Sequence, residues 1–294
     1  MLQLKGAGVA LITPFNKKGE VDYPSLKRVV EFIIEDGIDY LVVQGTTGES
    51  PVLSKEEKHK TLDFILDINK GTVPIVYGIG GNNTSELVNT IKNTNFEGID
   101  ALLSVTPFYN KPQQEGLYQH YAAVSEASPV PVILYNVPGR ASTNLTAETT
   151  LRLAHDFKNI VGVKEASGNI AQIMEIIKER PADFLVISGD DLLTLPIMSL
   201  GADGLISVAA NACPGCMTQL VKECLEGDFK AAAETHYQVM DFINTLFLDG
   251  SPSGVKAAMS MMGLCENIVR LPLVPVNKGV YEKIKSALEG ILAE

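Results

Sequence analysis

The sequence predicts an α/β protein, a (β/α)8 TIM barrel followed by a small helical C-terminal layer. Short apolar segments rich in Val, Ile and Leu recur eight times along the 294 residues, separated by polar or Gly-rich loops and amphipathic stretches. Continuous apolar strands that alternate with helices are typical of a parallel sheet covered on both faces. Eight units of roughly 25–30 residues match the closed barrel. An open doubly wound sheet, the alternative, usually has a glycine fingerprint after its first strand, and VALITPFNKKGE carries none.

The expected strands follow one another at regular intervals. They are GVALIT (8–13), YLVVQG (40–45), PIVYGIG (74–80), ALLSVT (101–106), PVILYN (131–136), IVGVKEA (160–166), FLVISGD (184–190) and GLISVAAN (204–211). In the stretches YPSLKRVVEFIIEDG (23–37) and SKEEKHKTLDFILDIN (54–69), apolar residues recur at helical spacing. This spacing predicts amphipathic helices between the strands.

About a quarter of the chain follows the eighth expected strand. Residues 217–247 and 279–294 are helix-like, and no low-complexity linker separates them from the strands. We therefore expect residues 1–224 to form the barrel that carries the active site. Residues 225–294 are expected to form a C-terminal helical layer packed on the barrel.

Composition and charge restrict the class of partner. The net charge of −11 gives a field that repels nucleic acid and anionic membranes. No apolar run approaches the roughly 18 residues of a membrane span. The first 15 residues contain no small-residue cleavage site after their apolar stretch, so they read as a strand rather than a signal peptide. We expect a cytoplasmic protein without nucleic-acid or membrane partners.

The cysteines and histidines suggest no metal site. Cys213 and Cys216 have the spacing of a zinc half-site or a redox pair, but no second close pair or His partner lies nearby. We interpret them as ordinary reduced cysteines. The sequence also lacks a Walker motif and a dinucleotide fingerprint, so no cofactor is expected.

Polar residues gather where the expected strands end. The carboxyl ends read TPF, GTTGES, GIGGNN, TPFYN, YNVPGR, KEASGN, SGDD and SVAAN. Active sites of (β/α)8 barrels lie at this end of the strands. The concentration of hydroxyls, amides, small residues and charges predicts an active site on this rim.

Lys164 closes the apolar run IVGVK of the sixth strand. One interpretation is that it leaves the barrel and pairs with a carboxylate such as Glu165. The other is that the barrel removes the amine from water and thereby favours its neutral form. A neutral lysine can attack a ketone to form a Schiff base, which is an electron sink for carbanion chemistry.

Strand five supplies two further candidates. Tyr135 lies one strand before Lys164, where it could transfer protons during Schiff-base formation, or simply pack with its hydroxyl bonded locally. Arg140 follows a Pro-Gly turn. It could hold a carboxylate in two-point geometry, or it could be a surface arginine.

Two loops supply the remaining candidates. Thr46 and Thr47 stand between glycines after strand two, which suits a small carboxylate held by hydroxyls and amides; helix capping is the alternative. Tyr109 lies on a Pro-bounded loop, where packing or an oligomer contact is the more common role. Together the residues predict lysine-dependent carbon–carbon chemistry on a small carboxylated ketone.

These motifs resemble a known family. LITPF, GTTGES, TPFYNKPQQEGLYQHY, YNVPGR, VGVKEASGN, SGDD and GLISVAAN are similar, in order and over nearly the whole chain, to those of the dihydrodipicolinate synthase family. The resemblance implies a lyase of lysine and diaminopimelate biosynthesis that condenses pyruvate with L-aspartate 4-semialdehyde. It also implies a homo-oligomer, a homotetramer built as a dimer of dimers.

The resemblance assigns the catalytic roles. Lys164 would form the Schiff base with pyruvate, and Tyr135 would donate and accept protons. Thr46 would be the middle of a hydroxyl relay, into which Tyr109 would reach from the neighbouring subunit.

It also assigns the binding roles. Thr47 and the backbone of Ile206 would hold the pyruvate carboxylate, and Arg140 would bind the semialdehyde carboxylate at the mouth. Gly189 would lie in a loop that lines the substrate site.

The sequence leaves two alternative functions, a related aldolase and a non-catalytic binding protein. N-acetylneuraminate lyase and 2-keto-3-deoxy sugar-acid aldolases share the lysine and the tyrosine, but they typically carry Ser-Thr in place of Thr46-Thr47 and lack a match to Arg140. A non-catalytic binding protein on the same barrel would be expected to have lost Lys164, Tyr135 or Thr46, and all three are present.

The resemblance implies an effector site as well. Lysine-inhibited members bind lysine at a subunit interface, and the matching polar residues here are Ser50, Asn82 and Glu86. However, Lys55 and Lys58 stand where those members often carry histidines, and Phe108 replaces a tyrosine that contacts the effector. Two ammonium groups would oppose a cationic effector. We therefore expect weak or absent feedback inhibition.

Overall fold

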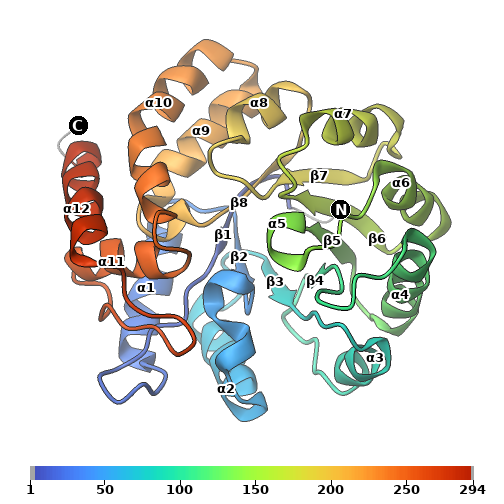
Figure 1. Ribbon diagram of the computed structural model, residues 1–294, viewed down its shortest axis with the longest axis horizontal. Coiled ribbons are helices and arrows are strands. Elements are labelled where there is room, and N and C mark those ends of the chain that lie inside the picture. Colours follow the sequence, from blue (N-terminus) through green and yellow to red (C-terminus); the bar gives the residue numbers. More distant parts are fainter. Residues whose placement is uncertain (1–3, 293–294) are drawn as a thin grey trace.

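The barrel predicted from the sequence is confirmed. The computed structural model describes residues 4–292, in which eight parallel strands close in chain order around one axis (Figure 1). The strands are β1 (Gly6–Ala10), β2 (Tyr40–Val43), β3 (Ile75–Gly78), β4 (Ala101–Val105), β5 (Val132–Asn136), β6 (Ile160–Glu165), β7 (Leu185–Ser188) and β8 (Gly204–Ser207).

The first strand is shifted relative to the expected segment 8–13. It begins at Gly6, which pairs with Gly204 of β8, and it ends at Ala10. The chain leaves the sheet there because the side chain of Asn211 takes over its hydrogen bonds. Asn211 Oδ1 accepts from Ile12 N at 3.0 Å, and Asn211 Nδ2 donates to the carbonyl of Ala10 at 2.8 Å.

Helices surround the barrel (Figure 1). They are α1 (Tyr23–Glu35), α2 (Lys55–Asn69), α3 (Thr84–Lys92), α4 (Gln114–Ala127), α5 (Pro138–Ala141), α6 (Ala147–Asp156), α7 (Ile170–Glu179), α8 (Thr194–Ser199) and α9 (Pro214–Glu226). Polar side chains cap several starts; Ser54 and Glu57 form a reciprocal capping box at α2, and Asn83 accepts from the backbone at the start of α3.

Three helices form the C-terminal layer. They are α10 (Phe229–Leu246), α11 (Ser253–Met261) and α12 (Lys278–Leu292), and Figure 1 shows them gathered on the side of the barrel that carries α1 and α9. α10 packs on α8, α9 and α12 through apolar residues such as Phe242 and Leu246. The expected boundary after residue 224 falls in the last turn of α9 and stays a prediction. Residues 293 and 294 of the expected terminal helix lie outside the described part.

The interior of the barrel is packed with side chains below the rim formed by the carboxyl ends of the strands. Tyr40, at the first position of β2, is fully buried and donates its hydroxyl hydrogen to the carbonyl of Leu205 at 3.2 Å. It joins an apolar cluster inside the barrel that includes Leu4, Val42, Ile133 and Ile206. The amino-terminal end of the barrel is therefore filled, and open space lies towards the carboxyl ends of the strands.

Candidate active site

Lys164 and Tyr135 face one another inside the barrel. They are direct partners in the β5–β6 register, and Lys164 Nζ lies 4.4 Å from the centre of the Tyr135 ring. Both side chains are buried, with 5% and 8% of their surface exposed. An amine in this position is screened from bulk water and lies beside a phenol that can exchange protons.

Glu165 points to the opposite face of β6 from Lys164. Its carboxylate accepts hydrogen bonds from Asn136 Nδ2 at 2.7 Å, Gln172 Nε2 at 2.9 Å and Ser167 Oγ at 2.5 Å. Burial raises the pKa of Glu165, and these hydrogen bonds oppose the rise. The alternative in which Lys164 pairs with Glu165 is therefore wrong, and within residues 4–292 no carboxylate lies within 4.0 Å of Lys164 Nζ.

A cavity of about 330 Å³ opens above this pair. It brings together six of the residues selected from the sequence, namely Thr46, Thr47, Tyr135, Arg140, Lys164 and Gly189. An adjoining cavity of about 410 Å³ shares Thr46, Tyr135 and Arg140 and extends to Ser50 and Phe108. The two cavities together form a passage from the rim to the lysine.

The two threonines occupy one tight turn. The 3-10 helix η1 (Thr46–Gly48) follows β2; Thr47 is buried, whereas Thr46 is exposed to the cavity. A Cβ on Gly48 would lie 3.1 Å from the carbonyl oxygen of Leu11, and Thr13 Oγ1 donates to the Gly48 carbonyl at 2.7 Å. The turn is thus pressed against the end of β1, which orients its hydroxyls.

Arg140 stands at the mouth of the cavity. It lies on the short helix α5, which begins at Pro138, and its side chain is exposed. No ion pair engages its guanidinium within the described part of the chain. The group is therefore available to a carboxylate that enters from solvent.

Acidic residues and the C-terminal layer also line the cavity, which the sequence did not indicate. Asp191 is buried, burial raises its pKa, and its Oδ2 accepts from the amides of Val208 and Ala209, both at 3.1 Å. This contact shapes the loop after β8. Phe247 and Ser251, which follow α10, complete the wall. In the sequence, only the SGDD motif pointed to the acidic residues. It identified them as polar residues at a strand end and did not predict the contact of Asp191 with the loop after β8.

Two expected residues lie outside the cavity lining. Ile206 is buried in β8 within the interior apolar cluster. Tyr109 is 87% exposed and has a left-handed backbone, with a φ of 72°. Its loop is held by Asn82 Nδ2, which donates to the carbonyl of Phe108 at 3.1 Å. Tyr109 therefore projects away from the cavity of its own chain.

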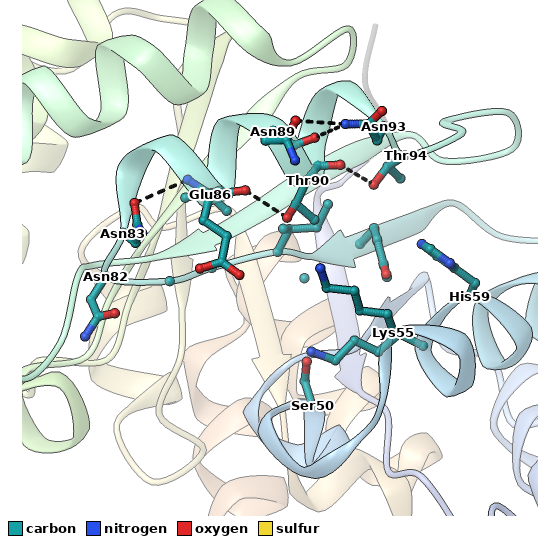
Figure 2. Close-up of a pocket in the computed structure, with 17 residues that line it drawn as sticks. Ser50, Lys55, His59, Asn82, Asn83, Glu86, Asn89, Thr90, Asn93 and Thr94 are labelled. Atoms are coloured by element: carbon teal, nitrogen blue, oxygen red, sulfur yellow. Dashed lines mark hydrogen bonds between the residues drawn. The ribbon is translucent and has the colours of Figure 1, made fainter.

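The three effector-site residues also lie together. Ser50, Asn82 and Glu86 line a cavity of about 420 Å³ between α2 and α3 (Figure 2). Lys55 and Lys58, both on α2, also line it, and Figure 2 shows Lys55 on the side across from Glu86. Burial and the neighbouring Lys55 lower the pKa of Lys58. The cavity is therefore mixed in charge, with two amines and one carboxylate.

The Cys213–Cys216 pair lies at the start of α9. Cys213 occupies the position before the first helical residue, Cys216 lies in the first turn, and all four cysteines are free thiols. A hydrogen bond between the two thiols lowers the pKa of Cys216 and raises that of Cys213. Across residues 4–292, no group of three or more His, Cys, Asp or Glu side chains is arranged to hold a metal ion, and no helix is long and apolar enough to cross a membrane.

Gly189 gives a direct test of the packing around the lysine. A Cβ there would lie 2.8 Å from Lys164 Cε and 2.8 Å from the Cβ of Ala166, so Gly189→Ala should displace the Lys164 side chain. We expect kcat to fall by about 10²-fold, the usual cost of a displacement near 1 Å. Gly139→Ala is the matched control, because Gly139 also lines the cavity but has open space around its Cβ position. Equal activity of the two variants, measured by initial rates, would contradict this account.

Known proteins have a similar sequence and fold. The sequence model of the dihydrodipicolinate synthetase family matches residues 3–291. A 4-hydroxy-tetrahydrodipicolinate synthase from Parabacteroides distasonis is 52% identical over 98% of this chain and 97% of its own. The crystal structure of dihydrodipicolinate synthase from Aquifex aeolicus has 42% identity and a TM-score of 0.94, with 97% of each chain covered. The enzyme from Cyanidioschyzon merolae with lysine bound has 34% identity and a TM-score of 0.96, with both chains fully covered.

These matches span both the barrel and the C-terminal layer. They confirm the family resemblance, and with it a lyase that forms a Schiff base in the manner of class I aldolases. The buried lysine, its tyrosine partner and the cavity above them are what such chemistry requires. The chain belongs to the dihydrodipicolinate synthetase family.

Proposed function

We propose that this chain is a 4-hydroxy-tetrahydrodipicolinate synthase, which condenses pyruvate with L-aspartate 4-semialdehyde in diaminopimelate and lysine biosynthesis. The observation that carries the proposal is the buried Lys164, which faces Tyr135 and pairs with no carboxylate in the described structure. The free thiols support a reducing compartment, and we infer a cytoplasmic location.

The reaction starts with the amine of Lys164 attacking the ketone carbon of pyruvate. The carbinolamine loses water, and the resulting imine accepts the electron pair released when the methyl group loses a proton. The enamine carbon then attacks the aldehyde of the semialdehyde. The substrate amine finally displaces Lys164 from the imine, which closes the ring and frees the enzyme. The imine itself is the electron sink, so these steps need no cofactor.

The proposed proton carriers are Tyr135, Thr46 and Tyr109 of a neighbouring subunit. Tyr135 and Thr46 line the same cavity as Lys164. Catalytic hydrogen bonds often tighten only when substrate is bound, so shared access to the cavity supports the relay. Thr47 and the Ile206 backbone are the proposed holders of the pyruvate carboxylate, with Gly189 leaving room beside the lysine.

A coupled assay distinguishes this function from the related aldolases. Turnover of pyruvate with aspartate semialdehyde, without cleavage of N-acetylneuraminate, is the expected result. Arg140→Ala should raise KM for the semialdehyde much more than for pyruvate, because the loss of one charge-assisted contact costs about 1.5–3 kcal/mol. Cleavage of N-acetylneuraminate without synthase turnover would overturn the proposal.

Tyr109 supports the proposal that activity requires an oligomer, a dimer at least and a homotetramer in full. An aromatic side chain that is 87% exposed has no partner for its ring in its own chain's cavity. Tyr109→Phe should lower kcat, and hybrids with Lys164→Arg chains should recover activity, because each chain supplies what the other lacks. Equal numbers of the two variant chains would be unfolded, mixed and refolded together. No recovery, or a fully active monomer in analytical ultracentrifugation, would contradict this role.

The mixed-charge cavity supports weak or absent inhibition by lysine. Glu86 can attract the effector's amine, but Lys55 and Lys58 oppose a cation at the same place. We expect L-lysine to leave initial rates nearly unchanged up to millimolar concentration at subsaturating pyruvate. The variant with Lys55→His and Lys58→His should become more sensitive. Half-inhibition of the unmodified enzyme at submillimolar lysine would show that Asn82 and Glu86 dominate.

A further inference from the structure

A second lysine is buried more completely than Lys164. Lys256, on α11, has no exposed side-chain surface, and its Nζ lies 2.5 Å from Oε1 of Glu49, whose side chain is 1% exposed. The same Nζ donates to the carbonyl of Ile268 at 2.9 Å and stands 4.1 Å from the centre of the Phe15 ring. Burial lowers the pKa of Lys256, and the Glu49 carboxylate opposes that change. The amine is fully engaged, and the reaction described above makes no use of it.

Glu49 directly follows the turn that carries Thr46 and Thr47. Its backbone is left-handed, with a φ of 53°, and its amide donates to the carbonyl of Thr46 at 3.1 Å. Its second carboxylate oxygen, Oε2, accepts from the amide of Arg270 at 2.9 Å. Both oxygens of Glu49 are thus held by the C-terminal layer, while its backbone is bonded to Thr46.

The Arg270 side chain fixes the surroundings of the same turn. Its guanidinium donates to both carboxylate oxygens of Glu57, at 2.8 and 2.5 Å, and to the carbonyls of Val52 and Gly19 at 3.0 and 2.8 Å. These partners lie after β2 and after β1. The arginine therefore braces the segments on either side of the threonine turn.

A buried ion pair is a poor source of stability, because the cost of removing two charges from water often exceeds their attraction. What such a pair does supply is a defined geometry, since neither charge can move without losing its partner. Here the pair joins a residue of the C-terminal layer to one that is bonded to Thr46. The pair therefore connects the C-terminal layer to the turn that carries Thr46.

We propose that the Glu49–Lys256 ion pair is a positioning device that holds Thr46 in place for proton transfer, so that the C-terminal layer takes part in forming the site. The inference rests on the proposed function, because it concerns the proton relay of that reaction. Glu49 and Lys256 are positioning residues, since they act through Thr46 and line none of the cavities described above.

The central experiment is a mutant cycle between the ion pair and Thr46. The double variant Glu49→Gln/Lys256→Met removes both charges together and avoids an unpaired buried charge. It should remain folded, lower kcat by about 10²-fold and change KM for pyruvate little. In a Thr46→Val background the same double change should cost no further activity, because residues that act as a unit are strongly non-additive. A merely structural pair would instead give losses that multiply.

Two controls keep the result interpretable. Arg180→Met breaks another largely buried ion pair, with Asp203, whose side chains are 17% and 8% exposed, and it should lower the thermal unfolding midpoint without changing kcat. Glu49→Asp keeps both charges but shortens the carboxylate arm, so it should fold even if the double variant does not, with a reduced kcat.

The outcomes distinguish failure of the proposed function from failure of the positioning role. Absence of synthase turnover in the unmodified enzyme would remove the proposed function, before any variant is tested. With that turnover established, either of two results would overturn the positioning role. One is a folded Glu49→Gln/Lys256→Met or Glu49→Asp enzyme with undiminished kcat. The other is a loss that multiplies with that of Thr46→Val.

Discussion

Borohydride reduction in the presence of pyruvate should attach one adduct to each chain, and the adduct should lie on Lys164. Lys164 Nζ faces the cavity and the Tyr135 ring, so it can reach a ketone that enters from the rim. Lys256 is buried as well, but its ammonium is held by Glu49 and Ile268 and lines none of the cavities described above. Peptide mapping by mass spectrometry would locate the adduct.

The matched variant is Lys164→Arg, which keeps a positive charge but cannot form an imine. It should take up no adduct and should lose about 10⁴-fold or more in kcat, as expected when a nucleophile is removed. Omission of pyruvate should abolish labelling of the unmodified enzyme. An adduct on a different lysine of an active enzyme would rule out the mechanism.

Loss of either relay hydroxyl should give the second largest effect. Tyr135→Phe and Thr46→Val each remove one oxygen and nearly preserve side-chain volume, so the fold should survive. General acid–base groups contribute about 10²–10⁴-fold, and kcat should fall by that amount while Schiff-base trapping with borohydride becomes slower.

Tyr40→Phe provides the control for loss of a buried tyrosine hydroxyl. Tyr40 is fully buried at the amino-terminal end of the barrel, and its hydroxyl donates to the carbonyl of Leu205 at 3.2 Å. This variant should lower the thermal midpoint and leave kcat unchanged. If Tyr135→Phe and Thr46→Val behaved like Tyr40→Phe, the hydroxyl relay would be refuted.

Local sequence patterns predicted the barrel and much of its rim. Lys164 and Tyr135 were identifiable because each interrupts an apolar strand, and strand order alone placed the two strands side by side. Thr46, Thr47 and Arg140 follow strand ends, so the carboxyl-end rule of the barrel was sufficient to bring them to one cavity.

Features that depend on distant contacts were not predictable in this way. The shortened first strand depends on the Asn211 side chain, which lies about two hundred positions later in the chain. Glu49 and Lys256 are 207 residues apart in the sequence. Each residue type is common on protein surfaces, so neither position by itself indicates a buried ion pair. Asp191 resembled a polar strand end until its contacts with two backbone amides were visible.

The filled amino-terminal end of the barrel has a consequence for the order of substrate addition. Tyr40 and the apolar cluster around it close the far side of Lys164, so both substrates must use the same entrance. Arg140 stands at that entrance and lines both parts of the passage. A semialdehyde bound there would obstruct the route to the lysine. We therefore expect pyruvate to bind first, and we expect excess semialdehyde to slow the enzyme by occupying this entrance before the imine has formed.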